Sequence, residues 1–280
     1  TNDQLDAPCL EVLAQGKTTL LALRSAGFNH VDLPAARRLR LRGVRVPEYS
    51  PYAIAEHVIA LIQTLNRKTH KAYNRVREGN FCLDGLVGCD LHGKTVGIVG
   101  TGRIGKVLAQ ILRGFGCTLL LHDLAPDEAF AQGLACEYVP LQTILRNSDI
   151  ISLHLPLTPL TRHLIGAAEF AQMKKGVMLI NTGRGGLINT KELIRSLKSG
   201  HIGQAGLDVY EEESGIFFED QSALVMSDDV LARLLSFPNV LVTGHQGFLT
   251  HEALTNIAVT TLANISAAER GDVLVNELLG

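Results

Sequence analysis

The chain has 280 residues, of which 46% are hydrophobic, and its 26 basic and 28 acidic residues leave a net charge of −2. This length allows one large or two ordinary domains, and the near-neutral charge gives no electrostatic basis for binding nucleic acid or an anionic membrane. The five cysteines include no C-x-x-C pair and the histidines no metal-ligand spacing, so we expect a reducing cytoplasm and no metal site.

The first 50 residues predict short helices over 5–13 and 33–41 and strands over 18–23 and 44–46. Two parallel strands are fewer than the about four to six that open sheets usually contain, so we expect further strands of this domain outside the given sequence. The loop over 24–29 follows the first strand. Loops at the carboxyl ends of parallel strands are where ligands bind in such sheets.

A long helix is predicted to start at Ser50-Pro51, which provide an N-cap and a first-turn proline. It runs to about residue 70. One face carries apolar residues at helical spacing, namely Ile54, Val58, Leu61, Ile62 and Leu65. So broad an apolar surface predicts burial between domains or between subunits. A connection with several glycines, over 79–93, then leads into the next part of the chain.

Gly100, Gly102 and Gly105 form a G-x-G-x-x-G motif between a buried strand over 96–99 and an amphipathic helix. Such glycines let the backbone approach a pyrophosphate at the positive end of the helix. Asp123 ends a second strand, over 117–122, close to the expected distance for the acid that binds an adenosine ribose. Its carboxylate would bind the 2′-hydroxyl and repel a 2′-phosphate. The motif therefore predicts NAD as the cofactor, in preference to NADP.

Strands and helices alternate from Asp123 to the end of the chain, which predicts a doubly wound parallel α/β sheet of the Rossmann type. The expected strands lie over 134–139, 150–154, 177–181, 202–207 and 240–243. The expected helices lie near 141–147, 167–174, 190–199, 229–236 and 250–270.

Each later strand is followed by a polar or charged group, and a parallel sheet brings these strand ends to one edge. Arg184 could bind a carboxylate bidentately, and Glu213 beside His245 would orient the imidazole and favour its protonated form. Each residue also has a plainer interpretation: a structural histidine, a surface ion pair, or a solvated acidic loop at Glu211–Glu213. The residues alone predict a nicotinamide-dependent oxidoreductase acting on a small anion. Eight other histidines are predicted to be structural: His30, His57, His70, His92, His122, His163, His201 and His251.

Seven segments spread over the chain resemble the D-2-hydroxyacid dehydrogenases: RSAGFNHVD (24–32), VPEYSPYAIAEH (46–57), GTGRIG (100–105), HLPLT (154–158), MKKGVMLINTGRGG (173–186), GLDVYEEE (206–213) and GHQGFLT (244–250). IFFED (216–220) and GHQGFLT are similar to the branch of that family that interconverts pyruvate and D-lactate. The resemblance implies an NAD-dependent enzyme with reversible hydride transfer. Two alternatives stay open: reduction of a bulkier 2-oxo acid such as phenylpyruvate or hydroxypyruvate, and an NAD(H)-sensing binding protein similar to corepressors of this fold.

The resemblance also implies how the chain divides. Residues 1–49 and the C-terminal helix over 247–280 would form a smaller, flavodoxin-like α/β substrate domain, and 50–246 the NAD-binding domain, with the active site between them. Relative to the family, about 50 residues of the substrate domain are not in the sequence, since one βαβ unit takes about 30 or more. We expect a homodimer or homotetramer that has a small 2-oxo or 2-hydroxy acid as substrate and no nucleic-acid or membrane partner.

The family's motifs imply site residues on this chain. Arg184 would hold the substrate carboxylate, His245 would donate the proton, and Glu213 would pair with His245. The implied substrate-binding residues are Ser25, Ala26, Gly27, Tyr49 and Phe248. The implied cofactor-binding residues are Gly100, Gly102, Arg103, Ile104, Gly105, Asp123, Leu155, Pro156, Thr161, Thr182, Gly183 and Asp208.

Overall fold

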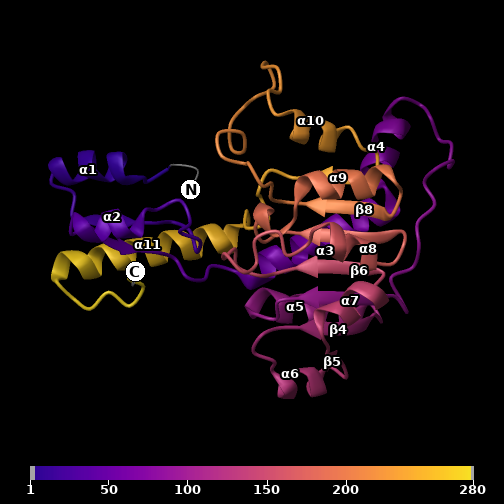
Figure 1. The fold of residues 1–280 in the computed structure, drawn as a ribbon, viewed down its shortest axis with the longest axis horizontal. Helices are drawn as coiled ribbons and strands as arrows, with labels where there is room; N and C mark the ends of the chain where they lie inside the picture. The colour runs from indigo at the N-terminus through magenta and orange to yellow at the C-terminus, as the bar shows by residue number, and fades with distance from the viewer. Residues whose placement is uncertain (1–3, 279–280) are drawn as a thin grey trace. The chain divides into compact units, whose positions relative to one another are not determined.

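The computed structural model describes residues 4–278, which form two compact units (Figure 1). The larger unit is Ile54–Gly247, and the smaller unit combines the chain before Ile54 with the chain from Phe248 onward. Each unit is described by itself below.

A seven-stranded, fully parallel sheet forms the centre of the larger unit. Its order is β5-β4-β3-β6-β7-β8-β9, which confirms the predicted doubly wound Rossmann architecture. The strands are β3 (Thr95–Val99), β4 (Thr118–His122), β5 (Glu137–Tyr138), β6 (Ile150–Leu153), β7 (Val177–Asn181), β8 (Ile202–Leu207) and β9 (Val240–Val242). The chain direction across the sheet reverses between β3 and β6, and this switch point is where ligands bind in such folds.

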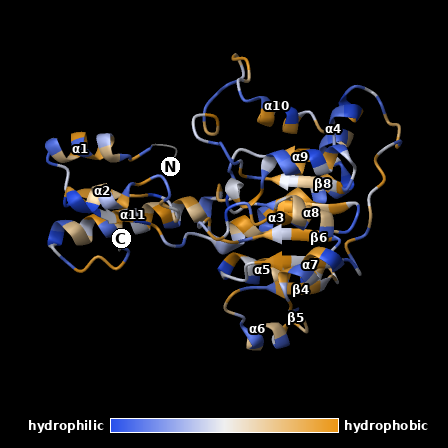
Figure 2. Cartoon of the chain, viewed as in Figure 1, coloured by the Kyte–Doolittle hydropathy of each residue, from blue (hydrophilic) through white to orange (hydrophobic). Residues whose placement is uncertain are grey.

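Helices cover both faces of this sheet, because side chains along each strand alternate between two apolar clusters. Val96 and Ile98 pack with α3 (Pro51–Arg67), α5 (Arg103–Gly114) and α6 (Glu128–Gly133). Val99 points to the opposite face, covered by α7 (Leu141–Asn147), α8 (Ala167–Gln172), α9 (Thr190–Lys198) and α10 (Asp229–Leu235). In Figure 2 hydrophobic residues gather in this layered region, and many hydrophilic residues lie on helix surfaces and loops.

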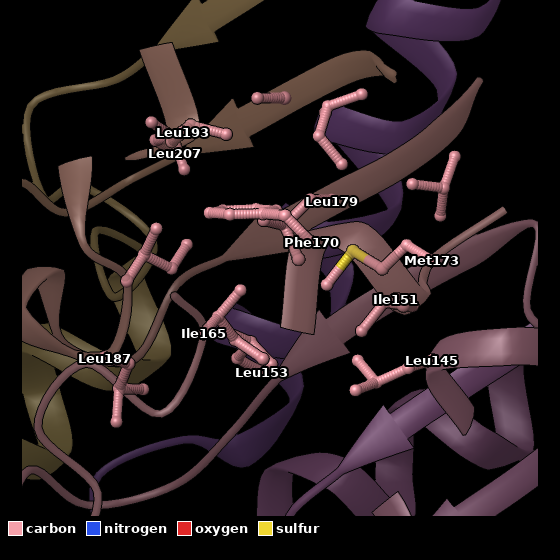
Figure 3. Close-up of a cluster of buried hydrophobic side chains, with 14 of the residues drawn as sticks. Leu145, Ile151, Leu153, Ile165, Phe170, Met173, Leu179, Leu187, Leu193 and Leu207 are labelled. Carbon is pink, nitrogen blue, oxygen red and sulfur yellow. The ribbon is translucent and has the colours of Figure 1, made fainter. Parts of the chain in front are cut away.

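The second of these clusters centres on Phe170 of α8, which is almost fully buried. Ile151 and Leu153 of β6 and Leu179 of β7 meet it from the sheet, and Leu193 contributes from α9 (Figure 3). This packing joins β6, β7 and β8, and the loops after these strands carry Arg184 and Glu213 among the predicted site residues.

The long helix predicted from Ser50 is α3, and the Ser50 hydroxyl accepts a hydrogen bond from the Ala53 amide at 3.2 Å, as expected of an N-cap. Val58, Leu61 and Leu65 are buried in the core of the larger unit. The apolar face that predicted an interface between domains or subunits therefore packs largely on its own sheet. The helix ends at Arg67, and a separate helix that was not predicted, α4 (Thr69–Arg77), follows it.

The smaller unit contains a two-stranded parallel sheet of β1 (Leu20–Ala22) and β2 (Arg42–Val44). Its helices are α1 (Ala7–Gln15), α2 (Leu33–Arg38) and α11 (His251–Arg270), and Leu10, Leu21 and Val31 are buried in its core. The first strand is shorter than the predicted 18–23, and the second has the predicted length but lies two residues earlier than 44–46. Although α11 has 20 residues, none of the helices within 4–278 has the length and hydropathy needed to cross a membrane.

Candidate active site

The turn between β3 and α5 is built from backbone and glycine. Gly100 has a φ of +96°, and a Cβ atom there would lie 2.6 Å from the carbonyl oxygen of His154. A Cβ atom at Gly105 would lie 2.1 Å from the oxygen of Gly100, so the first turn of α5 packs directly on the glycine turn. Gly102 is the N-cap of α5 and no side chain caps the helix. Uncapped amides at an open glycine turn fit the pyrophosphate of a dinucleotide.

Asp123 lies at the end of β4 beside this turn. Its Oδ2 accepts hydrogen bonds from the amide of Thr101 at 2.6 Å and from the Thr101 hydroxyl at 3.1 Å. Its Oδ1 accepts one from the Ala125 amide at 3.0 Å. Burial acts to raise the pKa of the Asp123 carboxyl, but these hydrogen bonds outweigh it and lower that pKa. The carboxylate is therefore ionised at neutral pH, which suits a ribose hydroxyl and disfavours a phosphate.

Other predicted cofactor residues lie on the same edge of the sheet, after β6 and β7. The Thr161 hydroxyl donates to the carbonyl of Pro156 at 2.7 Å and closes the loop that carries Leu155. The Thr182 hydroxyl is buried and has no hydrogen-bond partner among residues 4–278. A bound ligand could supply the hydrogen-bond partner that this buried hydroxyl does not find in the protein. Arg103 and Ile104 begin α5, and Gly183 follows Thr182.

His245 and Glu213 are brought together although 32 positions separate them. Nδ1 of the imidazole lies 2.9 Å from Oε1 of the carboxylate, and Oε2 accepts a hydrogen bond from the amide of Tyr210 at 3.2 Å. Both side chains are about one-quarter exposed. A carboxylate on Nδ1 fixes the ring orientation and leaves Nε2 as the nitrogen that can face a ligand.

Asp208, at the end of β8, holds the loop that carries His245. The carboxylate is almost fully buried and accepts hydrogen bonds from the Thr243 hydroxyl at 2.6 Å and from the amides of Gln246 and Gly247 at 2.9 and 2.8 Å. Burial opposes ionisation, but these contacts and His57, whose Nε2 is 3.2 Å away, lower the pKa of Asp208. The predicted contact of Asp208 with the cofactor stays a prediction.

This network explains two features that the sequence interpretation missed. His57 was predicted to be structural, and no sequence pattern indicated that its ring contacts the carboxylate that holds the loop of His245. His245 itself has a φ of +54°, a left-handed conformation rare for a non-glycine residue. Its amide donates to the carbonyl of Asp208 at 2.7 Å, so the loop around Asp208 keeps this strained residue in place.

Arg184 lies in the loop after β7. Its carbonyl accepts a hydrogen bond from the Asn181 side-chain amide at 2.8 Å, and its guanidinium donates to the Gly183 carbonyl at 2.7 Å. Among residues 4–278 no carboxylate pairs with this guanidinium, so the surface ion pair considered from sequence is not formed. A partly buried guanidinium in this state is suited to an anionic ligand.

Phe218 is a further neighbour of the site that the sequence interpretation did not single out. Its ring centroid lies 5.9 Å from that of His245, and the ring planes are inclined by 35°. The side chain is 53% exposed and its φ is +67°. The preceding Phe217 is buried with Tyr210 and Leu231, so the chain turns one ring into the core and the other onto the imidazole.

The predicted substrate-binding residues belong to the smaller unit. The Ser25 hydroxyl donates to the carbonyl of Gly27 at 2.7 Å, and Arg45 donates to the carbonyl of Ala26 at 2.8 Å, which together order the loop after β1. Tyr49 and Phe248, which are distant in sequence, meet edge to face with centroids 6.1 Å apart. Within this unit the structure therefore places two of the predicted pocket walls side by side.

Comparisons with known proteins identify the family to which the chain belongs. A family model described as the D-isomer specific 2-hydroxyacid dehydrogenase NAD binding domain matches residues 59–247. The chain belongs to this family of dehydrogenases. It is 54% identical over 264 residues to 2-hydroxyacid dehydrogenase A of Aspergillus oryzae, covering 94% of this chain and 76% of that protein. It is 52% identical over 278 residues to D-lactate dehydrogenase of Escherichia coli, covering 99% and 84%.

Solved structures extend the comparison to a ligand complex. D-lactate dehydrogenase from Aquifex aeolicus complexed with NAD and lactic acid has a TM-score of 0.89 and 32% identity, covering 99% of this chain and 84% of that chain. The cofactor of this dehydrogenase is NAD, as the glycine turn and Asp123 predicted. Bound NADH would supply a hydride.

Proposed function

We propose that this dehydrogenase reversibly reduces pyruvate to D-lactate with NADH, with His245 as the proton donor. The observation that carries this proposal is the 2.9 Å pairing of His245 with Glu213. The two residues come from the loops after β9 and β8, on the sheet edge that also presents Arg184 after β7. A cation for the carboxylate and a proton donor for the carbonyl are what reduction of a 2-oxo acid requires.

In the proposed reaction, Arg184 binds the substrate carboxylate through its guanidinium and orients the 2-oxo group toward the imidazole. The imidazolium of His245 donates its Nε2 proton to the carbonyl oxygen as the alcohol forms. Glu213 keeps Nδ1 engaged and stabilises the positive charge until the proton leaves. In the oxidation of D-lactate the neutral imidazole accepts the hydroxyl proton instead.

The proposal assigns the smaller unit to the substrate and the larger one to NAD. The domains would be 1–49 with 247–280, and 50–246. The backbone around Ser25, Ala26 and Gly27 would help to bind the carboxylate, and Tyr49 with Phe248 would restrict the substrate side chain to a small group. The cofactor contacts would be Gly100, Gly102, Arg103, Ile104, Gly105, Asp123, Leu155, Pro156, Thr161, Thr182, Gly183 and Asp208.

We infer further that the protein works in the cytoplasm as a homodimer or homotetramer. The five cysteines, all of them free thiols in the structure, support a reducing compartment. Sedimentation equilibrium would test the assembly: a mass of two or four chains is expected, and a monomer at working concentration would contradict it.

The substrate is tested by comparing kcat/KM for pyruvate, phenylpyruvate and hydroxypyruvate with NADH, and for pyruvate with NADPH. The proposal predicts the highest value for pyruvate with NADH. A higher kcat/KM for a bulkier acid would keep the proposed reaction but change its substrate. A misfit of one methylene changes kcat/KM by about 10- to 200-fold, so a difference of this size is expected between the acids. Tight NADH binding without turnover of any 2-oxo acid would contradict the enzyme function and favour a sensing role.

A further inference from the structure

Glu211 has an environment unlike that of an ordinary acidic loop residue. Its side chain is only 15% exposed, and one carboxylate oxygen accepts a hydrogen bond from Nε2 of His163. The other oxygen accepts two hydrogen bonds from Thr190, at 3.1 Å from the hydroxyl and 3.3 Å from the amide. Arg162 approaches the first oxygen at 3.6 Å. The plainer interpretation of 211–213 as a solvated acidic loop is therefore wrong for Glu211.

These contacts join three loops of the larger unit. His163 lies in the loop after β6, Thr190 is the first residue of α9 after the Arg184 loop, and Glu211 follows β8. Burial acts to raise the pKa of the Glu211 carboxyl, but the hydrogen bonds from His163 and Thr190 lower it. The carboxylate is thus an ionised group in a largely enclosed position, with both oxygens occupied.

The same contacts lie next to the candidate catalytic groups. A Cβ atom at Gly185 would lie 2.0 Å from the carbonyl carbon of Tyr210, so the residue after Arg184 packs directly on the peptide that leads into Glu211. The amide of His163 donates to the carbonyl of Gly186 at 2.7 Å, which holds the other side of that loop. Two residues beyond Glu211 lies Glu213, the partner of His245.

We propose that Glu211 and His163 form a positioning pair that fixes the Arg184 loop against the Glu213 loop. The inference rests on the proposed function, since it concerns where the substrate carboxylate and the proton donor stand relative to each other. Neither residue touches the reacting atoms. Their role is to keep two loops from different strands in one fixed relation, and a displacement of about 1 Å in such a relation can cost about 10²-fold in rate.

The acidic run supplies its own control. Glu212 is exposed and lies between the two inward-facing acids, so Glu212→Gln changes the same charge in the same segment. We expect Glu211→Gln to lower kcat/KM for pyruvate by about ten- to hundredfold, mainly through a higher KM, with the NADH dissociation constant unchanged. Glu212→Gln should leave kcat, KM and NADH binding unchanged. Equal kinetics in the two variants would overturn the proposal.

Two variants of His163 separate positioning from general stability. His163→Gln keeps a side-chain N–H that can donate to Glu211, whereas His163→Leu removes it. We expect the leucine variant to have a raised KM for pyruvate and the glutamine variant to have a KM close to that of the wild type. The two variants are compared at equal NADH-binding capacity. A leucine variant that unfolds more easily, but whose folded fraction has the wild-type KM, would show a structural role and contradict the proposal.

Amide hydrogen exchange makes the test independent of the substrate assignment. Segment 184–190 of Glu211→Gln should exchange faster than in Glu212→Gln, and exchange in 102–112 should not change. If the wild-type protein fails to reduce pyruvate while this difference is present, the proposed function fails and the positioning pair stands. If the wild-type protein reduces pyruvate and the difference is absent, the positioning pair fails alone.

Discussion

The binding edge of the larger sheet has two halves that differ in the groups they present. The backbone half is the turn after β3 together with Asp123, and the side-chain half is formed by the loops after β7, β8 and β9. After β3 the chain presents backbone: Gly100 and Gly102 leave the helix amides open, and the acid Asp123 comes from the adjacent β4. After β7, β8 and β9 it presents charged side chains linked across loops, as in the pair of Glu213 and His245. A diphosphate needs an open surface of donors, whereas proton transfer needs a few groups held at fixed distances, so each half suits its own task.

Removal of the proposed proton donor should have the largest effect. His245→Ala should lower kcat by about 10²- to 10⁴-fold, the usual contribution of a general acid, while leaving the NADH dissociation constant unchanged because the backbone half is intact. His251→Ala, at an exposed histidine of α11, is the matched control and should leave kcat and the NADH dissociation constant unchanged. Near-normal turnover of His245→Ala would remove this residue from the mechanism.

Replacement of Asp123 tests how the backbone half discriminates between NADH and NADPH. Asp123→Asn can still accept the hydrogen bond from the Thr101 amide, but it loses the charge that repels a 2′-phosphate. We expect the ratio of kcat/KM for NADPH to that for NADH to rise by about ten- to 150-fold, since a hydrogen bond to a charged group contributes about 1.5–3 kcal/mol. The KM for pyruvate should stay within twofold or so, which is measured in the same assays. An unchanged coenzyme ratio would argue against Asp123 as the discriminating group.

The tight loop contacts of the second half are tested with two glycines. Gly185→Ala would place a methyl group against the backbone of Tyr210, and overpacking of this kind costs about 1–3 kcal/mol. The folded protein should also have a higher KM for pyruvate, because the Arg184 loop must shift. Gly244→Ala is the control, since no atom lies within 4 Å of a Cβ built there. Denaturant unfolding and steady-state kinetics of both variants measure the two effects, and matching behaviour would contradict the packing argument.

The smallest expected effect concerns His154, between the two halves. Desolvation lowers its pKa to about 4, from 6.5, and the Ser152 hydroxyl lies 2.8 Å from its Nε2. Because the unfolded state binds more protons between these values, the stabilisation is present above about pH 6.5 and is lost as the pH falls toward 4. The full shift corresponds to about 3 kcal/mol, and because the residue as a whole is only partly buried we expect about 1–2 kcal/mol of it. His154→Gln should flatten the pH dependence of the unfolding free energy in this window. If the profile of the variant runs parallel to that of the wild type, His154 is not the group responsible for the pH dependence.

The sequence predicted the backbone half better than the side-chain half, and the reason is physical. The strand, the glycine turn and the helix at Gly100–Gly105 are encoded within a few adjacent residues, and the parallel sheet follows from the alternation of strands and helices. Two helices were missed, α4 and α6, because α4 has no buried residue and α6 buries only Ala131, so neither presents an apolar face that the sequence pattern could indicate. The strand expected over 134–139 shrinks to Glu137–Tyr138, at the sheet's edge.

The side-chain half depends on residues that are distant in sequence. The contacts of His57 with Asp208 and of His163 with Glu211 could be recognised only once the separate segments were assembled. Phe218 reaches His245 because of a left-handed turn that no local pattern indicates. The motifs that resemble the family named Arg184, Glu213 and His245, but they did not indicate what holds those residues in place.

The most direct test of the account is the reduction of pyruvate by NADH, with the lactate separated into its enantiomers on a chiral column. We expect rapid loss of NADH absorbance in proportion to the lactate formed, and D-lactate as the product. Formation of L-lactate, or binding of NADH with no lactate at all, would contradict the assigned reaction.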